Sequence, residues 1–443
     1  MTPPHTTLEN ISAGELRQIW SSLDREDRRR AFDHMASRTE REDFFLGLSA
    51  RSQAELLLEF PEERRRAWIR LLAPDDAVDV VQELPPDERV KLVDALDTFA
   101  QREVHALLAY AEDDAGGLMS PRYTRVRPDM TVDEAISYVR RQARDRSGGG
   151  HYVYVTDDTQ RLLGVLSFRE LFAAAPGTRV REVMNPSPIT AREDEDQEEL
   201  SRRFAEHNLT AVPVIDEAGR MKGIVTVDDI MDVVAEETTE DIHKYGGVQA
   251  LDVPYLEVGL FQMLRKRAPW LAVLFIGEML TATAMAYFED EIARAVVLAL
   301  FIPLIISSGG NSGSQASTLV IRAMALGEVA LRDFWRVTRR EFVTGLALGS
   351  ILGLIGLLRV VVWGTVFDGF GPHFVLLGLT VAASLVGVVL FGVLAGSLLP
   401  FALRRMNLDP ASASAPFVAT LVDVAGVVLY FSLAAVLLRG TLL

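Results

Sequence analysis

The chain has 443 residues and no cysteine, which excludes a disulfide framework, a zinc–thiolate site and a thiol nucleophile. Its net charge of −16 is uneven: residues 251–443 carry 12 acids and 13 bases, so residues 1–250 carry 49 of the 61 acids and 32 of the 45 bases. An acidic surface repels nucleic-acid phosphate and attracts cations. We therefore expect no nucleic-acid partner, and the acidity is either a solvated exterior or a cation-binding surface.

Residues 15–110 have apolar side chains at three- and four-residue steps, which is typical of amphipathic helices. Three of the expected helices begin at a proline followed by acids, in "FPEERRRAW", "LAPDDAVDV" and "LPPDERVKL". Proline suits a first helical turn, and acids there face the positive end of the helix dipole. Residues 1–118 are therefore predicted to form an N-terminal α-helical superhelix whose acidic side chains lie at solvated corners of the domain.

Residues 119–236 contain a tandem repeat. The first copy has "HYVYVTD" and then "LLGVLSFREL", and the second has "AVPVIDE" and then "MKGIVTVDDI". Asp157 and Asp216 are 59 residues apart, and so are Gly164 and Gly223. Short β-branched strands that alternate with helical segments predict an α/β module whose two copies pair with pseudo-twofold symmetry.

A dense run of acids follows in "DIMDVVAEETTEDIHKYGG", where carboxylates recur at three- and four-residue steps. On a helix such carboxylates lie on neighbouring faces and repel one another. Oxygen-only ligands suit Mg²⁺, Ca²⁺ or Mn²⁺ rather than zinc, so we predict a divalent-cation site, and a solvated acidic face is the alternative. The predicted ligands are Asp229, Asp232, Glu236, Glu237, Glu240 and Asp241, with Asp196 and Glu198 added from the second repeat.

Residues 237–267 lie between the second repeat and the first long apolar stretch, and we predict a connecting (plug) helix there. This position links the predicted cation site, as a sensor, to the part of the protein that would open in the membrane. When cations are scarce, repulsion between the acidic faces would separate them and shift a two-state element.

Five apolar stretches are long enough to cross a hydrocarbon core of about 30 Å as helices. They lie at 269–288, 293–317, 342–364, 374–400 and 413–438. Basic side chains cluster before the first stretch and in the connectors after the second and the fourth. By the positive-inside rule these connectors and the N-terminal domains are cytoplasmic, and the C-terminus is outside. Residues 268–443 are thus predicted to be a five-span transmembrane domain.

The last stretch, "FVATLVDVAGVVLYFSLAAVLL", contains one carboxylate, Asp423. A charge at the centre of a spanning helix costs about 2.5–3.5 kcal/mol on insertion scales, so Asp423 is either a ligand on an ion path or a residue that pins helix packing. From Ser307 to Gln315 the second stretch turns small and polar, which indicates close packing or a polar path. Glu278 in the first stretch adds to that path or pairs with a neighbouring backbone group.

The turn after each repeat's last strand has glycine, then serine or threonine three positions later, then an acid three positions further on. In this pattern the repeat resembles a pair of cystathionine-β-synthase (CBS) domains. The resemblance implies that the hydroxyl and the acid hold the ribose of ATP or another adenine nucleotide. The residues concerned are Ser167, Glu170, Thr226 and Asp229.

Strings along the whole chain are similar to the MgtE family of magnesium channels: "YAEDDAGGLMSP", "EETTEDI", "GGNSGSQASTLVIRAMALGE" and "LDP" followed by "APFVATLVDVAGVVLYF". The resemblance implies a bacterial inner-membrane homodimer with a helical superhelix, a CBS pair, a connecting helix and five spans per subunit. It also implies a Mg²⁺ pore on the dimer axis, lined by the second and fifth spans, and a cytosolic Mg²⁺ sensor.

By the same resemblance Asp423 is the pore aspartate, and Asp409 is the acid at the cytosolic entry of the fifth span. The implied sensor acids are Asp196, Glu198, Asp229, Asp232, Glu237, Glu240 and Asp241. Asn208 stands where a further sensor acid is expected, so this chain has one charge less at that site.

Two other functions compete with a magnesium channel. A secondary transporter coupled to protons or sodium would also use an intramembrane acid. A membrane-anchored cation or nucleotide sensor would use the spans only to hold a dimer. An enzyme is not expected, because the membrane half offers no nucleophile–base spacing and its histidine, His373, lies in an outside connector.

Overall fold

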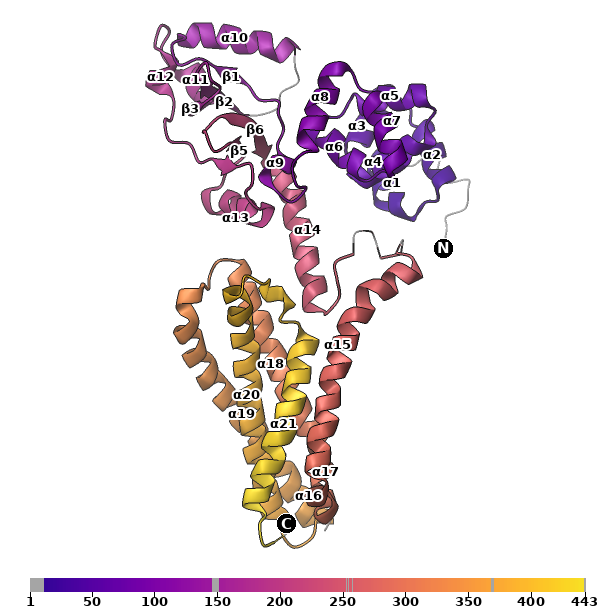
Figure 1. Ribbon diagram of the computed structural model, residues 1–443, viewed down its shortest axis with the longest axis vertical. Coiled ribbons are helices and arrows are strands. Elements are labelled where there is room, and N and C mark those ends of the chain that lie inside the picture. Colours follow the sequence, from indigo (N-terminus) through magenta and orange to yellow (C-terminus); the bar gives the residue numbers. More distant parts are fainter. Residues whose placement is uncertain are drawn as a thin grey trace. The chain divides into compact units, whose positions relative to one another are not determined.

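The structure, a computed structural model, describes residues 12–145, 151–251, 253, 255–256, 258–367 and 370–441. Residues 1–11 and 442–443, at the outer ends of the predicted first and last domains, lie outside the described residues. The chain divides into two compact units, Met1–Val234 and Ala235–Leu443 (Figure 1).

The first unit begins with short helices. They are α1 (Ala13–Ile19), the 3₁₀ turn η2 (Trp20–Ser22), α2 (Arg25–Asp33), α3 (Arg38–Leu46), α4 (Ala50–Glu59), α5 (Glu62–Ile69), α6 (Pro74–Gln82), α7 (Pro86–Asp94) and α8 (Thr98–Leu107). The predicted proline signals each start a helix: Pro61 is the N-cap of α5, and Pro74 and Pro86 are the first residues of α6 and α7. Aromatic rings fill the core, where Phe32 lies edge-on to Trp68 with ring centroids 5.1 Å apart. The predicted helical domain is confirmed.

Two matching α/β halves follow. The first comprises α9 (Ala115–Leu118), β1 (Arg125–Val126), α10 (Val132–Asp145), β2 (Tyr152–Thr156), β3 (Leu162–Ser167) and α11 (Phe168–Ala173), and the second comprises α12 (Val180–Val183), β4 (Ala191–Arg192), α13 (Gln197–His207), β5 (Ala211–Ile215), β6 (Met221–Thr226) and α14 (Val227–Tyr245). In each sheet the first strand pairs parallel with the second, and the second pairs antiparallel with the third. The predicted α/β repeat is confirmed.

The residues that repeat at a 59-residue spacing have the same local roles in both halves. The Asp157 carboxylate accepts the backbone amides of Thr159 and Arg161 in the β2–β3 turn, and Asp216 does the same in the β5–β6 turn. A Cβ on Gly164 or Gly223 would lie 2.6 Å from a backbone carbonyl oxygen. Both glycines are therefore required where two backbones approach closely.

The segment predicted as one connecting helix, residues 237–267, is not a single helix. Helix α14 begins inside the second repeat, continues through position 237 and ends at Tyr245. Gly247 follows with a φ of 72°, a left-handed conformation that glycine adopts readily and that ends helices. The described residues between Tyr245 and Leu260 belong to no helix, and the next helix begins at Leu260.

The second unit contains five helical spans, among the described residues, that are long and apolar enough to cross a membrane. Its elements are α15 (Leu260–Tyr287), α16 (Glu289–Arg294), α17 (Val296–Ala299), α18 (Ile302–Ala325), η3 (Leu331–Asp333), α19 (Phe334–Phe367), α20 (Phe374–Arg405), η4 (Pro410–Ser412) and α21 (Ala415–Leu437). The predicted five-span fold is confirmed, although the helices extend beyond the apolar stretches. Helix α18 continues to Ala325 because Arg322 in its last turn suits the negative end of the helix dipole.

Helices α18 and α20 pack through glycines. A Cβ on Gly392 would lie 2.3 Å from the carbonyl oxygen of Gly309, and a Cβ on Gly396 would lie 2.1 Å from that of Gly313. Small residues at four-residue spacing permit this approach of two spanning helices. We call this contact the glycine seam; it accounts for Gly309 and Gly313, but not for the polar residues between Ser307 and Gln315.

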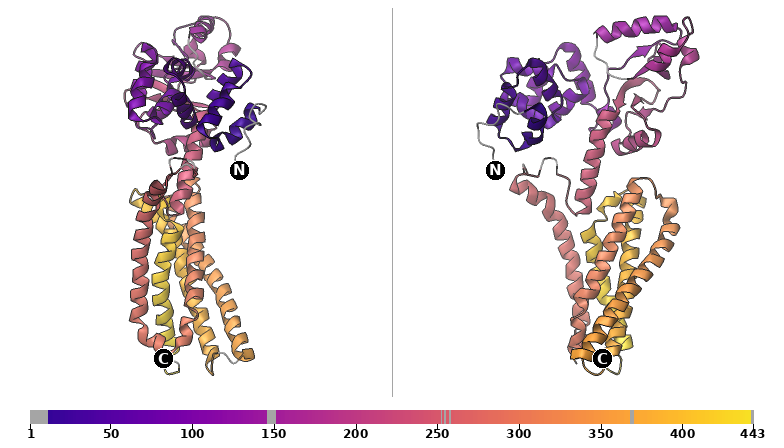
Figure 2. Two further views of the ribbon diagram at one scale, coloured as in Figure 1. Left: turned by 90° about the vertical axis from the view of Figure 1, so that its right-hand side faces the viewer. Right: turned by 180° about the vertical axis from the view of Figure 1, so that it is seen from behind.

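Helices α15 and α19 lie at opposite edges of the bundle, with α15 against α21 and α19 against α20 (Figure 2). Most of α15 is exposed, and Thr281 is the one buried side chain among its residues. A helix so sparsely covered has most of its surface available to lipid or to another subunit.

Candidate functional site

Carboxylates of α6 and of the start of α14 face one another within the first unit. Asp76 lies within electrostatic range of Asp228 and Asp232, and Asp79 lies within range of Asp229. Pro74 at the start of α6 sets the position of the acids in its first turns, and α14 follows directly after β6. The arrangement concentrates negative charge between two helices, which is the environment that attracts a divalent cation.

Burial raises the pKa of several carboxyl groups in this acidic cluster. Burial, together with Asp76, raises the pKa of Asp75 to about 6, although the Ser120 hydroxyl donates a hydrogen bond to Asp75 at 3.1 Å. Burial and the neighbouring acids raise the pKa of Asp79 to about 7 and that of Asp229 to about 7. Without a counter-ion these carboxylates are costly to ionise, so a bound cation would stabilise the folded unit.

Two other predicted sensor acids have local structural roles. Asp196 caps α13, where its carboxylate accepts the backbone amide of Glu198 at 2.9 Å. The Glu198 side chain forms an ion pair with Arg202 at 3.0 Å, one turn along the same helix. Asn208 ends α13 with a φ of 51°, a left-handed conformation that asparagine tolerates well. The helix end therefore explains the amide at this position.

The residues predicted to bind nucleotide also cap helices. The Glu170 carboxylate accepts the backbone amide and hydroxyl of Ser167 at 2.7 and 2.9 Å, at the start of α11. In the second repeat the Asp229 carboxylate accepts the Thr226 hydroxyl at 2.7 Å. Each hydroxyl–acid pair is thus a capping arrangement, which explains the sequence pattern without a ligand.

At the end of α14 a lysine contacts two predicted metal ligands. The Lys244 ammonium donates to Asp409 at 2.7 Å and also forms an ion pair with Glu240 one turn earlier. The next side chain, Tyr245, donates its hydroxyl to the carbonyl oxygen of Ser314 in α18 at 2.9 Å. The end of α14 is therefore fixed to the membrane unit by an ion pair and a hydrogen bond. Of the remaining predicted ligands on the same helix, Glu237 and Asp241 are half-buried and Glu236 is exposed.

Asp423 is half-buried in α21, and its carboxyl group is a hydrogen-bond partner of Glu278 in α15. Helix α18 runs antiparallel to α21. A Cβ on Gly310 of α18 would lie 3.6 Å from Ala419 of α21, and a Cβ on Gly426 of α21 would lie 3.5 Å from Ile306 of α18. Between these two contacts, Asp423 is level with Ser307.

Helix α18 carries a polar face beside this position. Ser307, Asn311, Gln315 and Thr318 follow one another at four- and three-residue steps and are all exposed. The Asn311 amide donates to the Ser307 hydroxyl at 3.4 Å. Polar side chains on the surface of a spanning helix are unfavourable toward lipid, so this face must be covered by protein or water.

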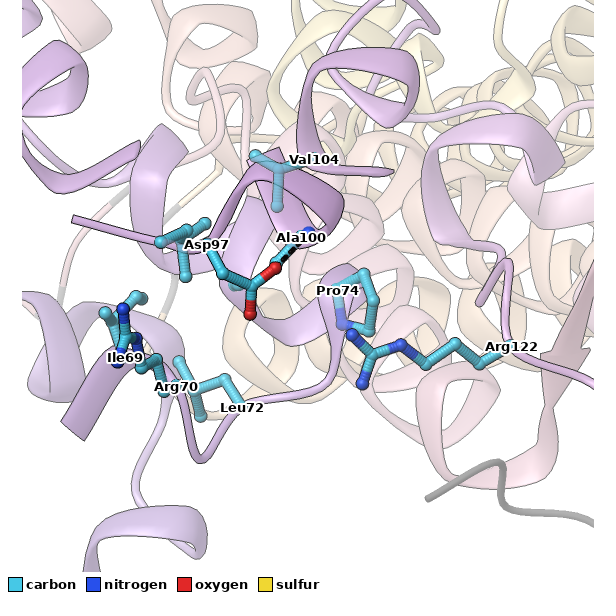
Figure 3. A pocket seen from close by; sticks show the side chains of 10 residues that line it. Ile69, Arg70, Leu72, Pro74, Asp97, Ala100, Val104 and Arg122 are labelled. Atoms are coloured by element: carbon cyan, nitrogen blue, oxygen red, sulfur yellow. Dashed lines mark hydrogen bonds between the residues drawn. The ribbon is translucent and has the colours of Figure 1, made fainter. Parts of the chain in front are cut away.

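A cavity of about 170 Å³ lies in the helical domain and is lined by Pro74 and other apolar side chains (Figure 3). Arg70, Asp97 and Arg122 carry its charges, and Asp97 accepts the backbone amide of Ala100 at 2.9 Å. Two guanidinium groups repel a divalent cation, so this cavity is not a cation site. Within the described ranges, no three acid or histidine side chains converge as a ready-made metal centre.

The sequence prediction missed the acids of α6 and the role of Lys244. The signal for Asp75, Asp76 and Asp79 was present in "LAPDDAVDV", but it was interpreted only as a helix start. For Lys244 the signal was its four-residue spacing from Glu240, which predicts an ion pair on a helix.

Comparisons with known proteins cover nearly the whole chain. The MgtE intracellular N domain matches residues 11–113, the CBS domain matches residues 112–177 and 180–236, and the MgtE divalent cation transporter domain matches residues 302–433. A solved structure titled as the cytosolic domain of the Mg²⁺ channel MgtE in complex with ATP is 42% identical; it covers 52% of this chain and 92% of that chain, with a TM-score of 0.47.

Two curated relatives are named magnesium transporter MgtE. The protein of Thermus thermophilus is 42% identical over 436 residues, which are 98% of this chain and 94% of the relative. The protein of Bacillus subtilis is 30% identical over an alignment of 417 residues, which covers 86% of this chain and 90% of the relative. The chain therefore belongs to the MgtE family of magnesium transporters, which are membrane proteins and not enzymes.

Proposed function

We propose that two copies of the chain form a Mg²⁺ channel in the bacterial inner membrane, with Asp423 on the ion path. The observation that carries the proposal is the exposed polar face of α18, from Ser307 to Thr318, level with Asp423 at one end. A second subunit facing it would enclose a polar path between spanning helices. The N-terminal domains and the basic connectors would then be cytoplasmic, and the C-terminus outside.

The chemistry of Mg²⁺ fits such a path. Mg²⁺ gives up its water reluctantly and is usually held by one or two carboxylates and several retained waters. One Asp423 from each subunit supplies two negative charges, which balance one divalent ion. Hydroxyl and amide groups on α18 can accept hydrogen bonds from the retained waters, so the ion is bound loosely enough to leave.

Cytosolic Mg²⁺ would close this channel through the acidic cluster of α6 and α14. Mg²⁺ between the facing carboxylates lowers their repulsion and favours the compact state, whereas its loss favours separation. The proposed regulatory ligands are Asp75, Asp76, Asp79, Asp229 and Asp232, together with the predicted Asp196, Glu198, Glu237, Glu240 and Asp241, while Asp409 lies at the pore entry. Binding of an adenine nucleotide by Ser167, Glu170, Thr226 and Asp229 stays a prediction, which ATP binding to wild type and to Thr226→Val tests.

The deciding experiment is Mg²⁺ uptake into proteoliposomes that contain the purified full-length protein. Asp423→Ala should abolish uptake while the protein still elutes as a dimer, and Asp409→Ala should reduce it. Uptake by wild type should fall as Mg²⁺ rises on the sensor side, and the triple amide variant of Asp75, Asp76 and Asp79 should need more Mg²⁺ for the same closure.

Three outcomes separate the alternatives. Uptake that saturates and depends on a proton or sodium gradient would indicate a coupled carrier. No uptake under any condition would indicate a membrane-anchored sensor. Normal uptake by Asp423→Ala would remove Asp423 from the ion path.

A further inference from the structure

Helices α15 and α21 run parallel and in register along their whole contact. Near one end the Trp270 indole donates to the Ser414 hydroxyl at 3.2 Å, and near the other the Phe288 and Phe431 rings stack with centroids 5.3 Å apart. Between them, a Cβ on Gly277 would lie 2.8 Å from the Thr420 methyl group. In each contact the α21 partner lies 143 or 144 positions further along the chain.

This register brings two polar residues of α15 to the height of Asp423. Along the helix axis, Asp423 is level with position 280 of α15. Glu278 therefore lies just before this level in the chain, and Thr281 lies just after it. The Glu278 carboxyl group is a hydrogen-bond partner of Asp423. The Thr281 side chain is 8% exposed, and no group in the described part of the chain pairs with its hydroxyl.

Both features are costly without a ligand. Two carboxylates side by side repel each other when both are ionised, and a divalent cation between or beside them removes that repulsion. A buried hydroxyl with no partner forfeits a hydrogen bond, which a water molecule bound to the cation would restore. Thr283, two positions away on the same helix, shows the ordinary arrangement, because its hydroxyl donates to the carbonyl oxygen of Met279 at 3.0 Å.

We propose that Glu278 and Thr281 of the first span complete the cation site at Asp423. Glu278 supplies a second carboxylate from the same subunit, and Thr281 holds a water of the hydrated divalent ion. The first span then contributes to ion binding, alongside the polar face of α18 and Asp423 of α21. The inference rests on the proposed function, since it takes Asp423 as a residue of the ion path.

The test measures Mg²⁺ uptake as a function of external Mg²⁺ in proteoliposomes of the full-length protein. Glu278→Gln removes the charge and keeps the shape, and its half-saturating Mg²⁺ concentration should rise about ten- to a hundredfold, as for loss of a supporting ligand. Glu278→Asp, which keeps the charge on a shorter side chain, should recover part of the affinity. Thr281→Val removes only the hydroxyl and should raise the half-saturating concentration by a smaller factor, about two- to tenfold.

Matched controls come from the same region. Thr283→Val removes a hydroxyl that already has a partner, and Glu289→Gln removes an exposed acid at the start of α16; both should leave half-saturation unchanged. A mere loss of stability in Glu278→Gln would lower maximal uptake and leave half-saturation unchanged, and would overturn the inference. Unchanged half-saturation in Thr281→Val would overturn the assignment of its hydroxyl, which does not depend on how Glu278→Gln folds.

The outcomes also separate this inference from the proposed function. If Asp423→Ala abolishes uptake while Glu278→Gln and Thr281→Val behave as wild type, the proposed function stands and the first span has no part in the site. If uptake survives Asp423→Ala, the proposed function fails, and this inference fails with it.

Discussion

The substitution Asp229→Asn should stabilise the first unit, because it removes one charge from the acidic cluster and keeps the helix cap. Thr226 donates its hydroxyl to the Asp229 carboxylate at 2.7 Å, and an asparagine carbonyl accepts the same bond. Burial, together with Asp75 and Asp228, raises the Asp229 pKa from 3.8 to about 7. At about 1.4 kcal/mol per pKa unit, the charge costs the folded state at most about 4 kcal/mol.

Because Asp229 is only half-buried, solvent screening reduces the expected gain in free energy of unfolding to roughly 1–2 kcal/mol. For a unit of this size the gain corresponds to roughly 2–8 °C in Tm. The folded protein binds the Asp229 proton more tightly than the unfolded chain does, so the cost is complete above about pH 7 and disappears toward the unfolded pKa of 3.8. The gain should therefore be largest at about pH 8 and less than about half as large at about pH 5.

The assay is thermal unfolding of the full-length protein in detergent, at both pH values, with EDTA and with Mg²⁺. Mg²⁺ should raise the Tm of wild type at about pH 8 more than that of Asp229→Asn, because the variant offers the ion less charge. Glu170→Gln is the control, since it alters the equivalent cap of the first repeat, outside the acidic cluster. Equal Tm changes in the two variants, or a gain as large at about pH 5 as at about pH 8, would refute the repulsion argument.

Two further substitutions test contacts of the second unit. Lys244→Gln removes the ammonium group that competes with Mg²⁺ for the regulatory ligand Glu240, so the Mg²⁺ concentration for half-closure in the uptake assay should fall about two- to fivefold; an unchanged value would show that the ion pair does not compete. Gly396→Ala places a Cβ 2.1 Å from a carbonyl oxygen and should cost about 1–3 kcal/mol, measured as a lower Tm. Gly387→Ala, whose nearest neighbour is 3.9 Å away, should be harmless, and equal Tm values for the two would contradict the packing argument.

The sequence predicted those features that depend on local patterns. Apolar runs of span length predict five helices, and the 59-residue repeat predicts two matching halves with glycine where backbones meet. It did not predict that α14 ends at Tyr245, because the decisive signal is the left-handed backbone of Gly247, and the surrounding acids suggest a helix that continues. A glycine pair after His243 and Lys244 was nevertheless a readable stop signal.

The candidate sites were predictable only in part, for a different reason. Asp423 stands out because a charge in an apolar stretch has few explanations. The proximity of Asp76 to Asp232 cannot be predicted from the sequence pattern, because folding brings together residues that are far apart in the chain. For Asp196 the structure adds a local role that its acid-rich surroundings do not indicate, because its carboxylate caps a helix.

The glycine seam limits which parts of the membrane unit can move. Where the Gly392 and Gly396 backbones press against the carbonyl groups of Gly309 and Gly313, any sliding of α18 along α20 would drive larger neighbouring side chains into positions that hold only a hydrogen atom. The two helices therefore move together as one rigid body. Any opening of a path along α18 must come from a hinge at the ends of this helix pair or from displacement of the more loosely covered α15, and not from shear within the pair.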